Sequence, residues 1–138
     1  MYVLDTDHIS LYQHGDVRIG RRLDSLPPNQ LVTTIVSYEE QLAGRLAIVR
    51  RAHTVNERIM AYRWLQHTLD FYCRMPVLQF DQAAGEILQS LQQLKLRTGT
   101  KDLLIGAITL ANEATLLTRN LRDFQRVPGL MIEDWASQ

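Results

Sequence analysis

The chain has 138 residues, 46% of them apolar and 22% charged, which is the composition of one ordinary globular domain. Fifteen Lys and Arg balance fifteen Asp and Glu, so net charge gives no argument for a nucleic-acid or anionic-membrane partner. The single cysteine, Cys73, excludes an internal disulfide and a zinc cluster. No signal-peptide core or bilayer-length apolar run is visible, so we expect a cytoplasmic protein without a membrane span, in which Cys73 is buried.

Short apolar runs alternate along the chain with stretches of helical periodicity. The runs predict strands over residues 2–4, 31–36, 75–80, 114–118 and 130–132. Helices are predicted over 9–13 and 16–26, from Ser37, from near Thr54, from Asp81, and from Thr100 to about Asn112. In the helix from near Thr54, the residues at helical spacing are Val55, Ile59, Tyr62, Leu65 and Leu69.

This alternation predicts an α/β fold of one domain over residues 1–138. Strands separated by helices form a mostly parallel sheet, here of about four to five strands, with helices on both faces. In such a sheet each strand ends at the edge where the next helix begins, and ligands bind at that edge. The polar residues that the chain delivers there are Asp5, Asp7, Glu39, Glu40, Asp102, Asn120 and Asp123.

Each of these residues also has a purely structural interpretation. Asp7 could cap the first helix, and Ser37 with Glu40 fits a capping box. Asp102 suits the dipole of a helix capped by Thr100, and the segment 120–123 could form another cap.

The acids taken as a set indicate a metal site. Unpaired like charges at one edge repel one another, and a divalent cation removes that repulsion. Carboxylates without a His or Cys pattern suit a hard ion, Mg²⁺ or alternatively Mn²⁺. A metal held in this way can activate water against a phosphodiester, and Arg119 and Arg122 beside the site suit phosphate contacts.

Four segments, in order, resemble the PIN-domain ribonucleases, specifically the VapC toxins of toxin–antitoxin pairs. The opening Tyr2–Asp7 is similar to the hydrophobic strand and Asp-Thr-Asp of that family. In Val36–Gly44 a Glu stands four residues before a Gly, which selects Glu40 and keeps Glu39 as the alternate. Asp102–Ala107 resembles the Asp that opens an apolar helix, and Leu117–Phe124, followed by Val127–Leu130, resembles the last motif.

The resemblance implies Mg²⁺-dependent endonucleolytic cleavage of RNA, a homodimer, and a small VapB-type antitoxin as partner. It implies that Asp5, Glu40 and Asp102 ligate the metal and that Thr6 and Thr118 orient the ligands. The fourth acidic position of several members is Asn120 here, so either Asn120 or Asp123 completes the site. The residues expected to act are Asp5, Glu40, Asp102 and Asp123, supported by Thr6, Asp7, Glu39, Thr118 and Asn120, with Arg119 and Arg122 toward the substrate.

Two other functions compete with the nuclease. Asp5-Thr6-Asp7 after a strand also fits a haloacid-dehalogenase-type phosphatase with Asp5 as the nucleophile. That class needs a late pair of acids, whereas Asp102 is followed by Leu103 and Leu104, and the chain is short for it. The other competitor is a non-catalytic PIN-like module that binds nucleic acid or protein, against which the presence of all three principal acids argues.

Overall fold

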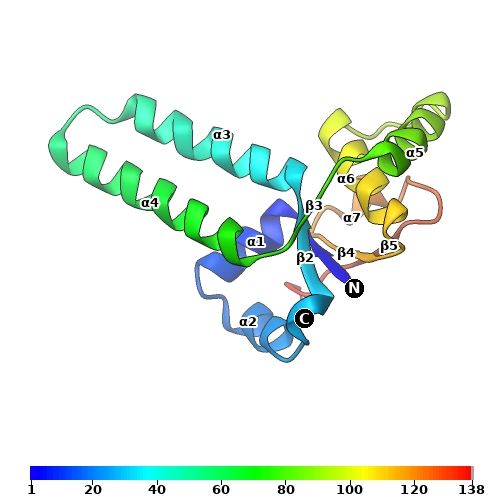
Figure 1. Cartoon of the computed structure of the whole chain (residues 1–138), viewed down its shortest axis with the longest axis horizontal. Coiled ribbons are helices and arrows are strands. Elements are labelled where there is room, and N and C mark those ends of the chain that lie inside the picture. The colour runs from blue at the N-terminus through cyan, green and yellow to red at the C-terminus, as the bar shows by residue number, and fades with distance from the viewer. Residues whose placement is uncertain (138) are drawn as a thin grey trace.

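Five short strands form one parallel sheet at the centre of the molecule (Figure 1). The computed structural model describes residues 1–137. In the sheet the strands follow the order β3-β2-β1-β4-β5, and every neighbouring pair is parallel. The α/β architecture predicted from the sequence is thereby confirmed. The strands are β1 (Tyr2–Leu4), β2 (Leu31–Thr34), β3 (Val77–Leu78), β4 (Thr115–Leu117) and β5 (Met131–Glu133).

The order in which the strands are added to the sheet changes side at β1. From β1 the sheet grows to β2 and β3 on one side and to β4 and β5 on the other, so β1 and β4 flank the switch point. Val3 is in register with Val32 and Leu116 of its two neighbours. In open parallel sheets the carboxyl ends of the strands at such a point form the ligand crevice.

Helices cover both faces of the sheet because successive residues of the buried strands point to opposite sides. Val3 packs with Ile105, Ile108 and Phe124 on one face, whereas Leu4 packs on the other with the first two helices and the C-terminal segment. The helices are α1 (Thr6–Gln13), α2 (Val17–Asp24), α3 (Ile35–Arg51), α4 (Val55–Arg74), α5 (Gln82–Gln93), α6 (Thr100–Ala111) and α7 (Leu121–Phe124), with a 3-10 turn at Pro28–Gln30.

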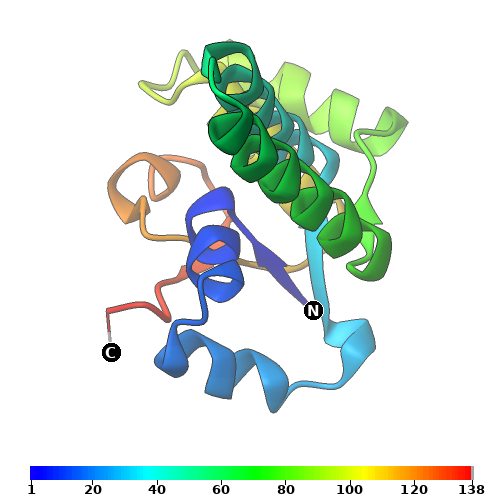
Figure 2. The same ribbon diagram turned by 90° about the vertical axis from the view of Figure 1, so that its left-hand side faces the viewer.

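Helices α3 and α4 form an antiparallel hairpin that extends well beyond the sheet (Figures 1 and 2). Helix α4 packs on α3, but no further sheet or helix covers the outer part of this hairpin, so the residues at helical spacing in α4 do not form a core face. Val55, Ile59, Tyr62 and Leu69 are between 50% and 70% exposed, and of the five expected residues only Leu65 is half-buried. Cys73, near the end of the same helix, is also exposed, so the expectation that it is buried was wrong.

Several element boundaries differ from those predicted. The second strand ends at Thr34 rather than near residue 36, and α3 begins directly after it. The first helix begins at Thr6 with Asp5 as its N-cap, three residues before the predicted start. The third strand is confined to Val77–Leu78. No helix within residues 1–137 is both long and apolar enough to cross a lipid bilayer.

Candidate active site

The carboxyl ends of β1 and β4 place Asp5 and Thr118 side by side. The Asp5 amide donates to the Leu117 carbonyl at 2.9 Å, which extends the ladder between the two strands by one residue. The Thr118 hydroxyl then donates to Asp5 Oδ2 at 2.8 Å. The two residues are 113 positions apart in the sequence and meet at the switch point of the sheet.

Asp5 is a buried carboxylate, with 7% of its surface exposed. Its Oδ1 accepts from the Thr6 amide at 2.8 Å, as an N-cap does. Burial, together with the negative charges of Asp7 and Asp102, raises the pKa of Asp5 to about 7, although its bonds from Thr118 and Thr6 act in the opposite direction. Asp5 therefore exchanges its proton near neutral pH.

Asp7 does not cap the first helix; it joins α1 to the loop after β4. Its Oδ2 accepts from the Arg119 amide at 3.0 Å, and His8 Nδ1 lies 2.9 Å from its Oδ1. His8 is fully buried, and its Nε2 accepts from the Trp135 amide at 3.1 Å, so the ring hydrogen lies on Nδ1 and is donated to Asp7. Both carboxylate oxygens of Asp7 therefore accept hydrogen bonds, and the one from the Arg119 amide ties α1 to the segment after β4, at the edge of the sheet where Asp5 lies.

Glu40 and Glu39 have different environments because neighbouring residues of a helix point about 100° apart. Glu40 Oε1 accepts from the Thr6 hydroxyl at 3.1 Å, beside Asp5. Glu39 is exposed and forms an ion pair with Lys101. The structure therefore brings Glu40, and not its alternate Glu39, into contact with Thr6, the residue after Asp5, and close enough to Asp102 to raise its pKa.

The expected capping box of Ser37 and Glu40 was wrong. Helix α3 begins at Ile35, and its N-cap is Thr34, whose hydroxyl accepts from the Ser37 amide at 3.1 Å. Ser37 is a fully buried residue within the first turn. Glu40 consequently takes no part in capping α3, and its side chain contacts Thr6 of α1 instead.

The side-chain amide of Asn120 links Asp102 and Asp123 by hydrogen bonds. Asn120 Nδ2 donates to Asp102 Oδ2 and to Asp123 Oδ2, each at 3.1 Å. Burial and the charges of Asp123, Glu40 and Asp7 raise the pKa of Asp102. The other oxygen of Asp123 lies 3.2 Å from an Arg126 nitrogen. Asn120 and Asp123 therefore both belong to the cluster, one as a donor and the other as an acid.

The remaining expectations for α6 and for the arginines are met in part. Asp102 lies in the first turn of α6, whose N-cap is Gly99 and not Thr100. Asn120 precedes α7 but makes no capping hydrogen bond with its side chain. The side chains of Arg119 and Arg122 are exposed on the segment after β4 that carries Asn120 and Asp123, and the charge of Arg119 helps lower the pKa of Asp134. Lys101 and Arg126, which hold Glu39 and Asp123, were not predicted, although the spacing of Arg126 three residues after Asp123 is visible in the sequence.

The donor set of this edge fits a hard cation. Its oxygens come from carboxylates, and mutual repulsion contributes to the raised pKa of Asp5 and of Asp102. In this structure Glu40, Asp5 and Asp102 each accept a hydrogen bond from a hydroxyl or amide donor. Within residues 1–137, no three Asp, Glu, His or Cys side chains are arranged so that they could hold a metal ion. To share one ion, the carboxylates would turn from these neutral donors toward a common centre.

Sequence comparison finds relatives that match about half of the chain and others that match nearly all of it. No protein-family model matches the sequence. The chain is 37% identical over 75 residues to ribonuclease VapC2 of Rickettsia felis, a match that covers 51% of this chain and 56% of that protein. It is 28% identical over 138 residues to ribonuclease VapC1 of Haemophilus influenzae strain R2866, a match that covers 99% and 98% of the two chains.

Solved structures show the same fold over nearly the whole length. VapBC2 from Rickettsia felis, bound to a DNA fragment from its promoter, superposes with a TM-score of 0.71 at 26% identity, covering 97% of this chain and 98% of the other. VapBC-1 from nontypeable Haemophilus influenzae gives a TM-score of 0.74 at 26% identity and covers 97% of each chain.

The fold and the clustered carboxylates define the class of protein. The parallel five-stranded α/β sheet is the PIN-domain fold of the solved VapBC neighbours, and in this chain acids gather at its switch point. The chain is a homologue of the VapC ribonucleases, and its resemblance to that family is confirmed.

Proposed function

We propose that this chain is a metal-dependent endoribonuclease and the toxin of a toxin–antitoxin pair. The observation that carries the proposal is the meeting of Asp5, Glu40 and Asp102 at one sheet edge. These acids come from segments about a hundred residues apart, in a chain homologous to proteins named ribonuclease VapC. Mg²⁺, or Mn²⁺ in its place, would polarise the phosphodiester and activate water when bound there.

The residues around the ion would have distinct tasks. Asp5, Glu40 and Asp102 would supply the ligand oxygens, with Thr6 and Thr118 fixing the orientation of two of them. Asn120 would hold Asp102 and Asp123 in place through its amide, and Asp123 would supply the fourth negative charge. Arg119 and Arg122, both exposed at the same edge, would contact the phosphates of the RNA.

A VapB-type antitoxin and a second copy of the chain are the proposed protein partners. Support for the antitoxin comes from the solved neighbours, which are VapBC complexes, whereas the second copy rests on the family resemblance. We expect co-expression with the antitoxin to abolish RNA cleavage, and light scattering of the purified protein to give twice the chain mass.

The phosphatase alternative loses support at Asp7. A haloacid-dehalogenase mechanism needs a second Asp as an acid and base, but both oxygens of Asp7 are held, by His8 and by the Arg119 amide. The non-catalytic binding module remains the alternative, and the cleavage test separates it from the nuclease.

The test is cleavage of a total cellular RNA pool by the purified, antitoxin-free protein in Mg²⁺ or in EDTA. Asp5→Asn is compared with Asp81→Asn, because both residues are helix N-caps and Asn caps as well as Asp. We expect discrete fragments with wild type and Asp81→Asn in Mg²⁺, and none with Asp5→Asn or in EDTA. Cleavage that survives EDTA or Asp5→Asn contradicts the proposal. A folded wild type that cleaves nothing in either Mg²⁺ or Mn²⁺ is a binding module.

A further inference from the structure

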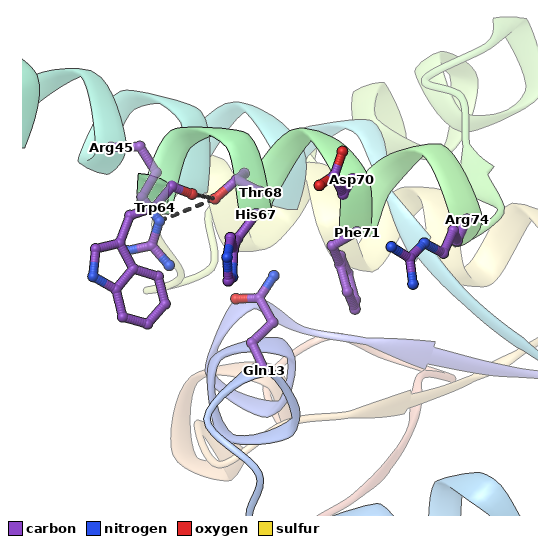
Figure 3. A pocket seen from close by; sticks show the side chains of 8 residues that line it. All are labelled: Gln13, Arg45, Trp64, His67, Thr68, Asp70, Phe71 and Arg74. Carbon is purple, nitrogen blue, oxygen red and sulfur yellow. Dashed lines mark hydrogen bonds between the residues drawn. The ribbon is translucent and has the colours of Figure 1, made fainter. Parts of the chain in front are cut away.

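A pocket lies between the end of α1 and the α3–α4 hairpin (Figure 3). The pocket has a volume of about 310 Å³, and side chains from all three helices line it. None of the acids at the sheet edge belongs to it. Its volume is at the lower end of the range for small-ligand pockets, about 300–1,000 Å³.

The pocket lies along the same contact between α1 and α3 that carries the candidate active site. At one end of this contact Thr6 donates to Glu40, and at the other Gln13 and Gln41 exchange amide hydrogen bonds of 2.9 and 3.3 Å. Gln13 lines the pocket. Since Thr6 and Gln13 are seven residues apart on one helix, the pocket begins about 10 Å from the acids. A nucleic-acid strand crossing the acids reaches the pocket within a few nucleotides.

Arg45 is fixed in the pocket with part of its guanidinium free. Its Nε donates to the Thr68 hydroxyl at 3.0 Å, and its Cζ lies 5.1 Å from the centroid of the Trp64 ring. In residues 1–137 neither Arg45 nor Arg74, at the other end of the pocket, has an acid within ion-pair distance. An ordered guanidinium group without an acid partner, as in Arg45, suits the phosphate of a nucleotide, and the exposed Arg74 is a second cation near it.

Three rings line the wall that α4 contributes. Trp64, His67 and Phe71 project from α4 toward Gln13 in Figure 3. The one acid of the pocket, Asp70, points away from them in that view, and its Oδ1 accepts from Gln66 at 3.1 Å. Aromatic surfaces beside arginines are the usual means of binding an unpaired base without regard to its sequence.

The surrounding hairpin is basic although the whole chain is neutral. Residues 35–74 contain six Arg and no Lys, against four acids, Glu39, Glu40, Glu57 and Asp70, which gives a net charge of +2 with His neutral; the part after Glu40, residues 41–74, carries +4. A local positive field of this kind attracts a polyanion and favours RNA over a neutral or basic peptide as the occupant.

We propose that this pocket binds one unpaired nucleotide of the RNA substrate, a few residues along the strand from the bond that is cut. The base stacks on Trp64 and His67, and Arg45 and Arg74 contact the adjacent phosphates. This inference rests on the proposed nuclease function and adds to it a place where the enzyme holds its single-stranded substrate.

The test measures RNA binding separately from cleavage. In an Asp5→Asn background, Arg74→Gln and His67→Ala are compared with Arg63→Gln and His53→Ala, exposed residues of the same hairpin outside the pocket. The probe is a fluorescein-labelled single-stranded oligoadenylate of about 10 nucleotides, titrated at several salt concentrations. Because each phosphate contact contributes about 0.7 to the salt slope of a single strand, Arg74→Gln should lower that slope by about 0.7.

We expect each pocket variant to weaken binding about five- to tenfold, as loss of a stacked base or of a phosphate contact does, with the two controls unchanged. In the active protein the same variants should raise KM for the oligonucleotide and leave kcat unchanged. Equal affinities for pocket and control variants would overturn the proposal. Unchanged RNA binding with weaker binding of the antitoxin would also overturn it and assign the pocket to that partner. A wild type that binds RNA through the pocket but cuts nothing would instead refute the nuclease.

Discussion

Two neighbouring acids, Glu39 and Glu40, lie in different environments although they are one residue apart. Glu40 contacts the Thr6 hydroxyl beside Asp5, whereas Glu39 pairs with Lys101 at the surface. The resemblance to the PIN-domain family, through the spacing to Gly44, selects Glu40, and in the structure Glu40 accepts from Thr6, the residue after Asp5. The competing capping interpretation failed because Thr34, the last residue of β2, caps the helix, and Ser37 lies inside its first turn.

We predict that Glu40→Gln lowers RNA cleavage about a hundredfold or more, since it removes a negative ligand from the reacting centre. Glu39→Gln is the matched control. It removes only an exposed ion pair, which contributes about 0–1 kcal/mol, and should leave the rate within about twofold of wild type. Initial rates on one RNA fragment measure both variants. Equal losses in the two would show that Glu40 has no special role.

Asp5 should make stability depend on pH when divalent ions are removed. Its pKa is about 7 in the folded state and 3.8 as the ordinary value, so between these pH values the folded protein binds more protons than the unfolded chain. The unfolding free energy therefore falls as pH rises from about 4 to about 7, by about 3 kcal/mol from this residue alone.

Asp5→Asn should remove that contribution while preserving the helix cap. In urea unfolding with EDTA, we expect the variant to gain stability relative to wild type between pH 5 and pH 8, by up to about 3 kcal/mol. A stability difference that is the same at both pH values would mean that Asp5 is not the buried ionising group described here.

At the scale of helices and strands, the cap of α3 connects folding to the site. Thr34 ends β2 and caps the helix that carries Glu40 in its second turn. Thr34→Ala should cost about 1–2 kcal/mol of stability and also reduce cleavage, because the cap fixes the first turn of α3, on which the position of Glu40 depends.

Thr54→Ala provides the comparison for that variant. Thr54 caps α4 in a capping box with Glu57, at the end of the hairpin that extends away from the sheet. We expect a similar loss of stability, about 1 kcal/mol, with cleavage unchanged. Thermal unfolding and cleavage rates are measured together, and a Thr34→Ala enzyme that is destabilised but fully active would contradict the coupling.

The sequence predicts the order and type of these elements well and their burial less well. Apolar runs identified all five strands. The three inner strands β2, β1 and β4 are largely buried, as in a parallel sheet covered on both faces, whereas the edge strands β3 and β5 are only partly buried. The spacing of Val55, Ile59, Tyr62 and Leu69 suggested a core face, but periodicity does not tell whether a partner surface exists. Here the hairpin projects beyond the sheet and leaves these residues exposed.

At the scale of the whole molecule, the sheet joins distant segments into one edge. The principle that parallel strands end together predicted the meeting of Asp5, Glu40 and Asp102 from the sequence. The contacts that support this edge were not predictable, since the Trp135 amide reaches His8 across 127 positions and the Arg119 amide reaches Asp7 across 112. Such pairs follow from tertiary packing and have no local sequence signal.

The central claim is that this edge holds a divalent cation through ionised carboxylates, Asp5 among them. Metal binding must displace the proton of Asp5, whose pKa is about 7, so binding should release protons at pH 6 and tighten as pH rises. Calorimetric titration of Mn²⁺ into the protein, in buffers of different ionisation enthalpy, measures affinity and proton release together and needs no RNA.

We predict Mn²⁺ binding with release of up to about one proton per ion at pH 6 and little release at pH 8, in wild type and in Asp81→Asn alike. Asp5→Asn should lose most of the affinity and all of the proton release. Absence of binding at millimolar Mn²⁺, or binding that is indifferent to both pH and Asp5→Asn, would contradict the account.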